Sequence, residues 1–198
     1  MPIEPFDRSF FTEMRASSGD RQMARVIDAS RPILYELAAA TAYLAYLNRR
    51  EGNEIVVVEA IDGTLTQDAL PRILHRAPIH CAASGKLLLA HAREHPDPAL
   101  NEPLVGLTSA SIGSIKLLAR QLSAIRNAGF AVNLGEHDSR RAAIAAPIFN
   151  ESNQALAAIG LAGMIEQFTP AEVDRLVPLV ISAAREVSRE LGWRGWVH

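Results

Sequence analysis

Apolar residues recur three and four positions apart in four parts of the chain, which is the spacing of amphipathic helices. The first of these predicted helices begins near Gln22, and Pro32 inside it predicts either two helical pieces or a kink. The last is capped by Thr169, carries Pro170 at its first position and contains Pro178, where a kink is expected. The predicted helices cover residues 22–40, 84–94, 114–129 and 169–192.

Between these helices, short runs rich in β-branched and alternating apolar residues predict five strands. Two of them flank a polar turn at 50–53 and predict a hairpin, and the last two are joined by a turn at 151–153. Residues 62–82 are expected to be irregular or to form an edge strand, because Pro71 and Pro78 cannot donate a ladder hydrogen bond. Grouped antiparallel strands with segregated helices indicate an α+β fold. The predicted strands cover residues 41–49, 54–61, 130–134, 142–150 and 154–164.

Composition narrows the classes of protein that fit this pattern. The 198 residues carry a formal charge of −2 and are 48% hydrophobic, which excludes a disordered chain and a strongly basic nucleic-acid surface. The chain has neither an uninterrupted apolar run long enough to span a membrane nor a secretory signal at its start. The single cysteine cannot form an internal disulfide, which fits a reducing compartment. We therefore expect a soluble cytoplasmic protein.

Two small groups of residues are candidates for catalysis or metal binding. Cys81 follows His80, and a neighbouring imidazole can activate a thiol, but adjacent residues of an extended segment face opposite sides, so a packed cysteine is favoured. Glu136, His137 and Asp138 could ligate a metal or transfer protons, although a solvated loop is favoured for the last two. The histidines have no metal-ligand spacing and no cofactor-binding motif is complete, so neither a metal nor a cofactor is expected.

The segment AASGKLLLA resembles a phosphate-binding loop only superficially, because it lacks the leading glycine and the hydroxyl residue after the lysine. A helix that begins at Ser84 or Gly85 nevertheless presents unpaired backbone N–H groups and the positive end of its dipole. This arrangement suits a small anion or a carboxylate. A plain helix cap is an equally good interpretation of the same residues.

Four segments in this order resemble the IclR family of bacterial transcriptional regulators. They are HRAPIHCAASGKLLLA, AIRNAGFAV, RRAAIAAPIFNESNQALAAIGLAG and a final helix ending in ELG. The resemblance covers roughly residues 22–192 and follows the effector-binding domain of the family. It implies a GAF-like fold, an antiparallel sheet flanked by helices on both sides, with residues 1–21 as a lead-in or linker remnant and 22–198 as the effector-binding domain.

The resemblance also implies a function and a site. Family members bind small organic molecules, often carboxylates, and control DNA binding by a winged helix-turn-helix, for which residues 1–21 are too short. Homodimers or homotetramers are implied, with DNA bound only through a domain absent from this chain, no membrane and no catalytic residue. The implied ligand-binding residues are Ala77, Ala83, Ser84, Gly85, Asn133, Ala143, Gly160 and Ala162.

This chain departs from carboxylate-binding relatives, which often have serines at the positions of Gly160 and Ala162 and an aspartate at the position of Asn133. We therefore expect a roomier, less polar pocket and a larger, partly apolar effector that contains a carboxylate. Two alternatives remain open. One is a stand-alone GAF-like enzyme with Cys81 as a reactive thiol, and the other is an interaction module with Trp193 and Trp196 as a docking patch, although these tryptophans could equally cap the core.

Overall fold

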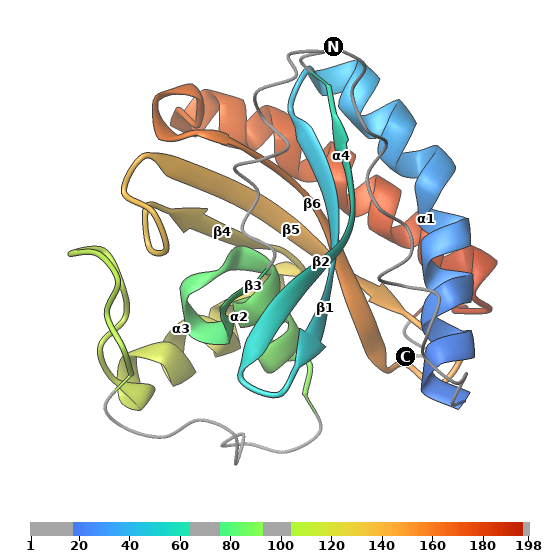
Figure 1. Cartoon of the computed structure of the whole chain (residues 1–198), viewed down its shortest axis with the longest axis horizontal. Coiled ribbons are helices and arrows are strands. Elements are labelled where there is room, and N and C mark those ends of the chain that lie inside the picture. The colour runs from blue at the N-terminus through green and yellow to red at the C-terminus, as the bar shows by residue number, and fades with distance from the viewer. Residues whose placement is uncertain (1–17, 64–75, 93–103, 196–198) are drawn as a thin grey trace, which may run out of the picture.

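The structure is a computed structural model that describes residues 18–63, 76–92 and 104–195. Six strands form one sheet in the order β3-β2-β1-β6-β5-β4, and each neighbouring pair is antiparallel. The sheet curls around the helices on one of its faces (Figure 1). The strands are β1 (Leu44–Glu51), β2 (Glu54–Asp62), β3 (Arg76–Pro78), β4 (Ala131–Leu134), β5 (Arg141–Phe149) and β6 (Ala155–Met164).

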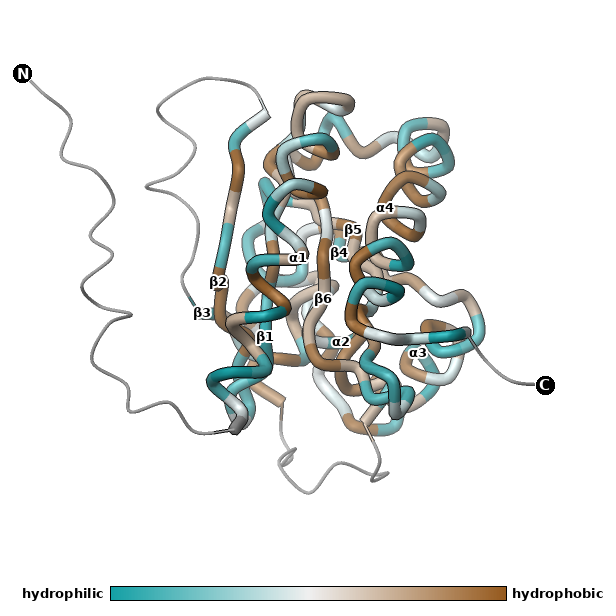
Figure 2. The backbone as a smooth tube through the Cα atoms, turned by 90° about the vertical axis from the view of Figure 1, so that its right-hand side faces the viewer, coloured by the Kyte–Doolittle hydropathy of each residue, from teal (hydrophilic) through white to brown (hydrophobic). Residues whose placement is uncertain are grey.

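Four α-helices cover the two faces of this sheet. The long helices α1 (Ser18–Thr41) and α4 (Pro170–Glu190) lie side by side on one face, and each alternates between hydrophobic and hydrophilic segments (Figure 2). The shorter helices α2 (Ala83–Ala90) and α3 (Ile115–Ala128) lie on the other face (Figure 1). Short 3-10 helices precede α2 and α4, at η3 (Ile79–Cys81) and η4 (Ile165–Gln167). The predicted α+β, GAF-like arrangement is confirmed.

The two faces of the sheet build two separate parts of the core, because side chains alternate along each strand. On the central strand β6, Ile159 and Leu161 are fully buried against α1 and α4. Their neighbours Ala158, Gly160 and Ala162 point to the opposite face, where Ala158 packs in one cluster with α2 residues. The small residues on this second face leave the space that α2 occupies.

Several element boundaries differ from the sequence-based expectation, among them the start of β1, which lies at Leu44 because α1 continues to Thr41. Helix α1 begins at Ser18 and runs through Pro32 as a single helix, because Ile33 and Leu34 pack into the core and offset the lost hydrogen bond. Strand β1 continues to Glu51, so only Gly52 and Asn53 form the turn, with Gly52 at φ +60°. Helix α2 ends at Ala90, four residues earlier than expected.

Helix α4 also runs through an internal proline, Pro178, as one helix. Thr169 caps it as predicted, because its side chain accepts a hydrogen bond from the backbone N–H of Glu172. Within the described ranges, no helix is both long and apolar enough to cross a membrane. The predicted edge strand is confirmed as β3, whose three residues pair with the start of β2.

Candidate functional site at the first turn of helix α2

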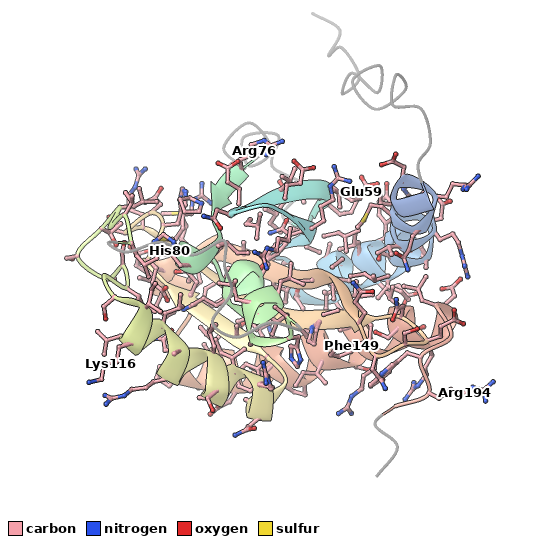
Figure 3. All side chains as sticks on the ribbon, turned by 90° about the horizontal axis from the view of Figure 1, so that it is seen from below. Glu59, Arg76, His80, Lys116, Phe149 and Arg194 are labelled. Carbon is pink, nitrogen blue, oxygen red and sulfur yellow. The ribbon has the colours of Figure 1, made fainter. Side chains whose placement is uncertain are left out.

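Helix α2 starts inside the protein rather than at its surface. Its N-cap residue, Ala82, has an extended backbone and offers no side-chain hydrogen bond to the first turn. Ala83 and Ser84 follow in that turn, each only 1% exposed. Buried N–H groups at a helix start attract negative charge, because the helix dipole adds to their own. Figure 3 shows α2 between the β1–β2 hairpin and α3, with His80 beside it.

Gly85 is required by the close approach of α2 to η3. A Cβ atom at this position would lie 1.9 Å from the carbonyl oxygen of Ile79, a distance that real Cβ atoms do not tolerate. The backbone of η3 therefore lies directly against the first turn of α2, with no side chain between them at Gly85. Gly85 contributes to the site by allowing this contact.

Strand register brings three of the predicted residues into one row. Asn133 on β4 pairs with Ala143 on β5, which pairs in turn with Ala162 on β6. Gly160 lies in the next row, opposite Ala145. Ala83 of α2 packs on the same face in a cluster with Ala145. Residues far apart in the sequence thus meet beneath the start of α2.

Ala77 is the predicted residue that the structure does not join to this group. It lies on β3, at the sheet edge opposite β4, and pairs with Ile55 of β2. Its side chain packs with Ile55, Ile79 and residues of α3 in a cluster separate from the one that holds Ala83. Ala77 therefore packs in a different part of this layer from the other predicted residues.

The space beside Gly160 is filled by Tyr46 of β1. A Cβ atom on Gly160 would lie 2.6 Å from the Tyr46 hydroxyl oxygen and 2.1 Å from the carbonyl oxygen of Ile144. Tyr46 is only 5% exposed and donates a hydrogen bond of 3.3 Å to that same carbonyl. Burial raises the pKa of the Tyr46 hydroxyl, so the phenol stays neutral. The extra room expected from Gly160 is therefore taken up by an aromatic ring.

Two asparagines flank the first turn of α2. Asn133 donates a 2.7 Å hydrogen bond to the carbonyl oxygen of Cys81 and accepts one of 2.9 Å from the N–H of Glu136. On the other side, Asn48 of β1 donates a 2.8 Å hydrogen bond to the hydroxyl of Ser84. The sequence analysis missed Asn48, although a polar residue at an inward position of an apolar strand was a usable signal.

A buried ion pair joins α2 to the turn after β4. The Lys86 ammonium donates to a carboxylate oxygen of Glu136, to the carbonyl oxygen of Val132 at 3.3 Å and to the side-chain oxygen of Gln121 at 3.2 Å. The side chains of Lys86 and Glu136 are only 2% and 10% exposed. Glu136 is therefore a buried partner of Lys86, whereas its half-buried neighbour Asp138 pairs with Arg140. In the sequence, the signal for this buried ion pair was a lysine directly before the apolar run LLLA.

An open hollow of about 350 Å³ lies beside this ion pair, between α3 and β4. Lys86, Gln121 and Glu136 supply its polar lining, and the remaining lining residues are mostly apolar. None of the three residues in the row, Asn133, Ala143 and Ala162, lines this hollow. Throughout the described ranges, no group of three or more His, Cys, Asp or Glu side chains could hold a metal ion.

The comparisons with known proteins agree with this architecture. The family model for the C-terminal domain of the bacterial transcriptional regulator IclR matches residues 21–189. The chain belongs to the IclR family. It is 31% identical to the HTH-type transcriptional regulator KipR of Bacillus subtilis over 92% of this chain and 73% of KipR. It is 30% identical to the HTH-type transcriptional regulator XynR of Escherichia coli over 81% of this chain and 64% of XynR.

A solved structure of another transcription factor shows the same fold. The inducer-binding domain of the PobR transcription factor from Acinetobacter, crystallised as a double mutant with 3-hydroxybenzoic acid, superposes with a TM-score of 0.74. It is 23% identical and matches 81% of this chain and 96% of that one. Residues 21–189 of this chain thus form a domain of the type found at the C-terminus of IclR regulators.

The IclR family is a family of non-enzymes, so the alternative of a thiol enzyme is not supported. The surroundings of Cys81 agree with this conclusion. Burial raises the pKa of the Cys81 thiol and the nearby Glu136 carboxylate adds to this effect, which disfavours the reactive thiolate. His80 and Cys81 lie in a 3-10 turn rather than an extended segment, and both contact the carbonyl oxygen of Val105. The thiol is a packed residue beside the site.

The C-terminal tryptophan Trp193 packs against the domain. Its indole stacks on Phe149 with ring centroids 5.4 Å apart and donates a 2.7 Å hydrogen bond to the side chain of Asn153. It therefore caps this end of the domain, as the preferred alternative to a docking patch predicted. Trp196 and His75 lie outside the described residues, as do His95 and His198.

Proposed function

We propose that this domain binds a small organic acid at the first turn of α2. The observation that carries the proposal is the buried start of α2, where backbone N–H groups without a side-chain cap meet a row of small residues on the sheet. The carboxylate of the effector accepts hydrogen bonds from the amides of Ala83, Ser84 and Gly85. Its apolar part packs against Ala143 and Ala162, with Asn133 closing the β4 side and Gly160 lying beneath Tyr46.

The effector acts on the whole regulator through the arrangement of its subunits. We expect a homodimer or homotetramer whose arrangements are populated differently with and without the effector. DNA is bound by a winged helix-turn-helix in another part of the assembly, in the cytoplasm. Light scattering should give two or four times the 21.5-kDa mass of the chain, and a monomer at micromolar concentration would contradict this part of the proposal.

A thermal-shift assay with a panel of acids tests the binding site. At a concentration of about 100 times the dissociation constant, an effector stabilises the fold by about 2.7 kcal/mol. For a domain of this size, that corresponds to a rise in Tm of about 5–10 °C. The panel contains acids with two or three carbons, branched acids and aromatic acids. Stabilisation by only the smallest acids would contradict the partly apolar effector.

A variant that introduces a negative charge tests the location of the binding site. Ala143→Asp introduces a carboxylate next to Ala162, at the proposed site. It should abolish the rise in Tm, because the new carboxylate repels the carboxylate of the ligand. The matched control is Ala39→Asp, which adds the same charge on the exposed side of α1 in the opposite layer, and it should retain the full shift. A shift that survives in Ala143→Asp would place the acid elsewhere.

A further inference from the structure

Asn48 has a side-chain oxygen without a hydrogen-bond partner in the part of the chain that the structure describes. This residue lies on β1 and is only 5% exposed. Its side-chain nitrogen donates to Ser84 in the first turn of α2, but its side-chain oxygen is shielded from solvent and has no hydrogen-bond partner among the described residues. A buried acceptor without a donor is unfavourable, so its presence beside a binding site indicates a ligand group.

Asn133, the asparagine on the other side of α2, differs in this respect. Its nitrogen and its oxygen are both engaged, with the carbonyl of Cys81 and the N–H of Glu136. These bonds connect β4 to η3 and to the turn that carries Glu136. Asn133 therefore shapes the site, whereas Asn48 retains an acceptor for a ligand.

The neighbours of Asn48 place its free oxygen next to the proposed acid site. Asn48 pairs with Ala158 on β6, two residues along the same sheet face from Gly160. Tyr46 stands on the same face of β1 and covers Gly160. The contact with Ser84 holds the amide of Asn48 against the residue whose backbone N–H is proposed to bind the carboxylate.

We infer that Asn48 hydrogen-bonds a hydroxyl group of the effector, which is therefore a hydroxy acid rather than an unsubstituted acid. A hydroxyl can donate to the free oxygen of Asn48, while the carboxylate of the same molecule accepts from the amides of α2. Asn48 is then a specificity-determining residue. This inference rests on the proposed acid-binding function and adds the second polar group of the ligand.

Matched pairs of acids that differ by one hydroxyl test the inference. Suitable pairs are lactate with propionate, 2-hydroxyisovalerate with isovalerate, and 3-hydroxybenzoate with benzoate, with dissociation constants measured by titration calorimetry. The wild-type chain should bind the hydroxy acid of at least one pair at least tenfold more tightly. In Asn48→Leu the ratio of the two dissociation constants should fall to about one, and far-UV circular dichroism shows whether the variant is folded.

The control variant is Ser30→Ala in α1 of the opposite layer, which removes a buried hydroxyl that has no hydrogen-bond partner among the described residues. It should retain the tenfold preference. A second variant, Asn48→Asp, has a side chain of nearly the same size, which keeps an acceptor oxygen and adds a negative charge. It should weaken both members of a pair at least tenfold by repelling the carboxylate, and it should preserve the preference for the hydroxy acid.

The outcomes separate the inference from the proposed function. A hydroxyl preference that persists in Asn48→Leu, or an affinity unchanged in Asn48→Asp, would overturn the role of Asn48. Equal affinity of the wild-type chain for both members of every pair would overturn the hydroxy-acid inference and leave the acid site standing. No binding of any acid would overturn both.

Discussion

At the scale of single residues, the ion pair between Lys86 and Glu136 is almost fully buried. Lys86→Met should lower the free energy of unfolding by about 3–5 kcal/mol, because it leaves an uncompensated charge on Glu136 in the interior. Urea unfolding measures this change. The double variant Lys86→Met, Glu136→Leu should recover part of the loss, and a double variant no more stable than the single one would contradict this explanation.

His91, at the end of α2, makes the stability of the domain depend on pH. Burial, followed by the nearby charge of Arg126, lowers the pKa of His91 from 6.5 to about 4. Below pH about 6.5 the unfolded chain therefore takes up a proton that the folded chain resists, so stability falls as the pH drops towards 4. His91→Gln should show a smaller loss between pH about 7 and about 4.5 in urea unfolding. An equal loss in both proteins would assign the pH dependence to other groups.

Residue types alone indicated only part of this chemistry. Ser84 and Asn133 were identified through the resemblance, yet the hydrogen bonds of Asn133 go to the protein's own backbone. Asn48 and Lys86 were not identified, because a polar residue within an apolar segment has no assigned partner until the strands and helices meet. Glu136 belonged to a polar triplet, and only the fold shows that it turns inward while Arg140 pairs with its neighbour Asp138.

At the scale of elements, the contact between α2 and η3 depends on Gly85. Gly85→Ala should destabilise the domain by about 1–3 kcal/mol or more, because the added Cβ collides with the backbone of Ile79 and α2 must shift. The control Gly113→Ala has no neighbour within 4 Å and should change stability by less than about 0.5 kcal/mol. Thermal unfolding compares the two, and a Gly85→Ala protein as stable as its control would show that the contact can relax.

The types and order of the elements followed from periodicity, but several of their ends did not. Pro32 interrupts the helical pattern locally, whereas burial of its neighbours keeps α1 continuous. The end of α2 at Ala90 was not predicted either, because no glycine or proline marks it and the next prolines come only at 96 and 98. Local signals predicted a boundary well where the residue there favours it, as the capping hydroxyl of Thr169 and the left-handed backbone of Gly129 do.

At the scale of the whole molecule, one sheet carries both helix layers, so the layers should unfold together. Leu87→Ala in α2 and Leu176→Ala in α4 each remove a fully buried side chain and should cost about 2–5 kcal/mol. Both variants should show one transition in urea, coincident by tryptophan fluorescence and far-UV circular dichroism. Separate transitions in either variant would mean that the two layers are independent folding units.

The sequence by itself determined the α+β class, the antiparallel strand groups, the family and the identity of most residues around the start of α2. These follow from local periodicity, capping residues and motifs that are contiguous in the chain. The tertiary structure alone decided that Tyr46 fills the space beside Gly160, that Asn133 is engaged internally and that the side-chain oxygen of Asn48 has no partner among the described residues. Each of these depends on which atom of a distant strand lies within a few ångströms, and strand register and helix placement set that distance.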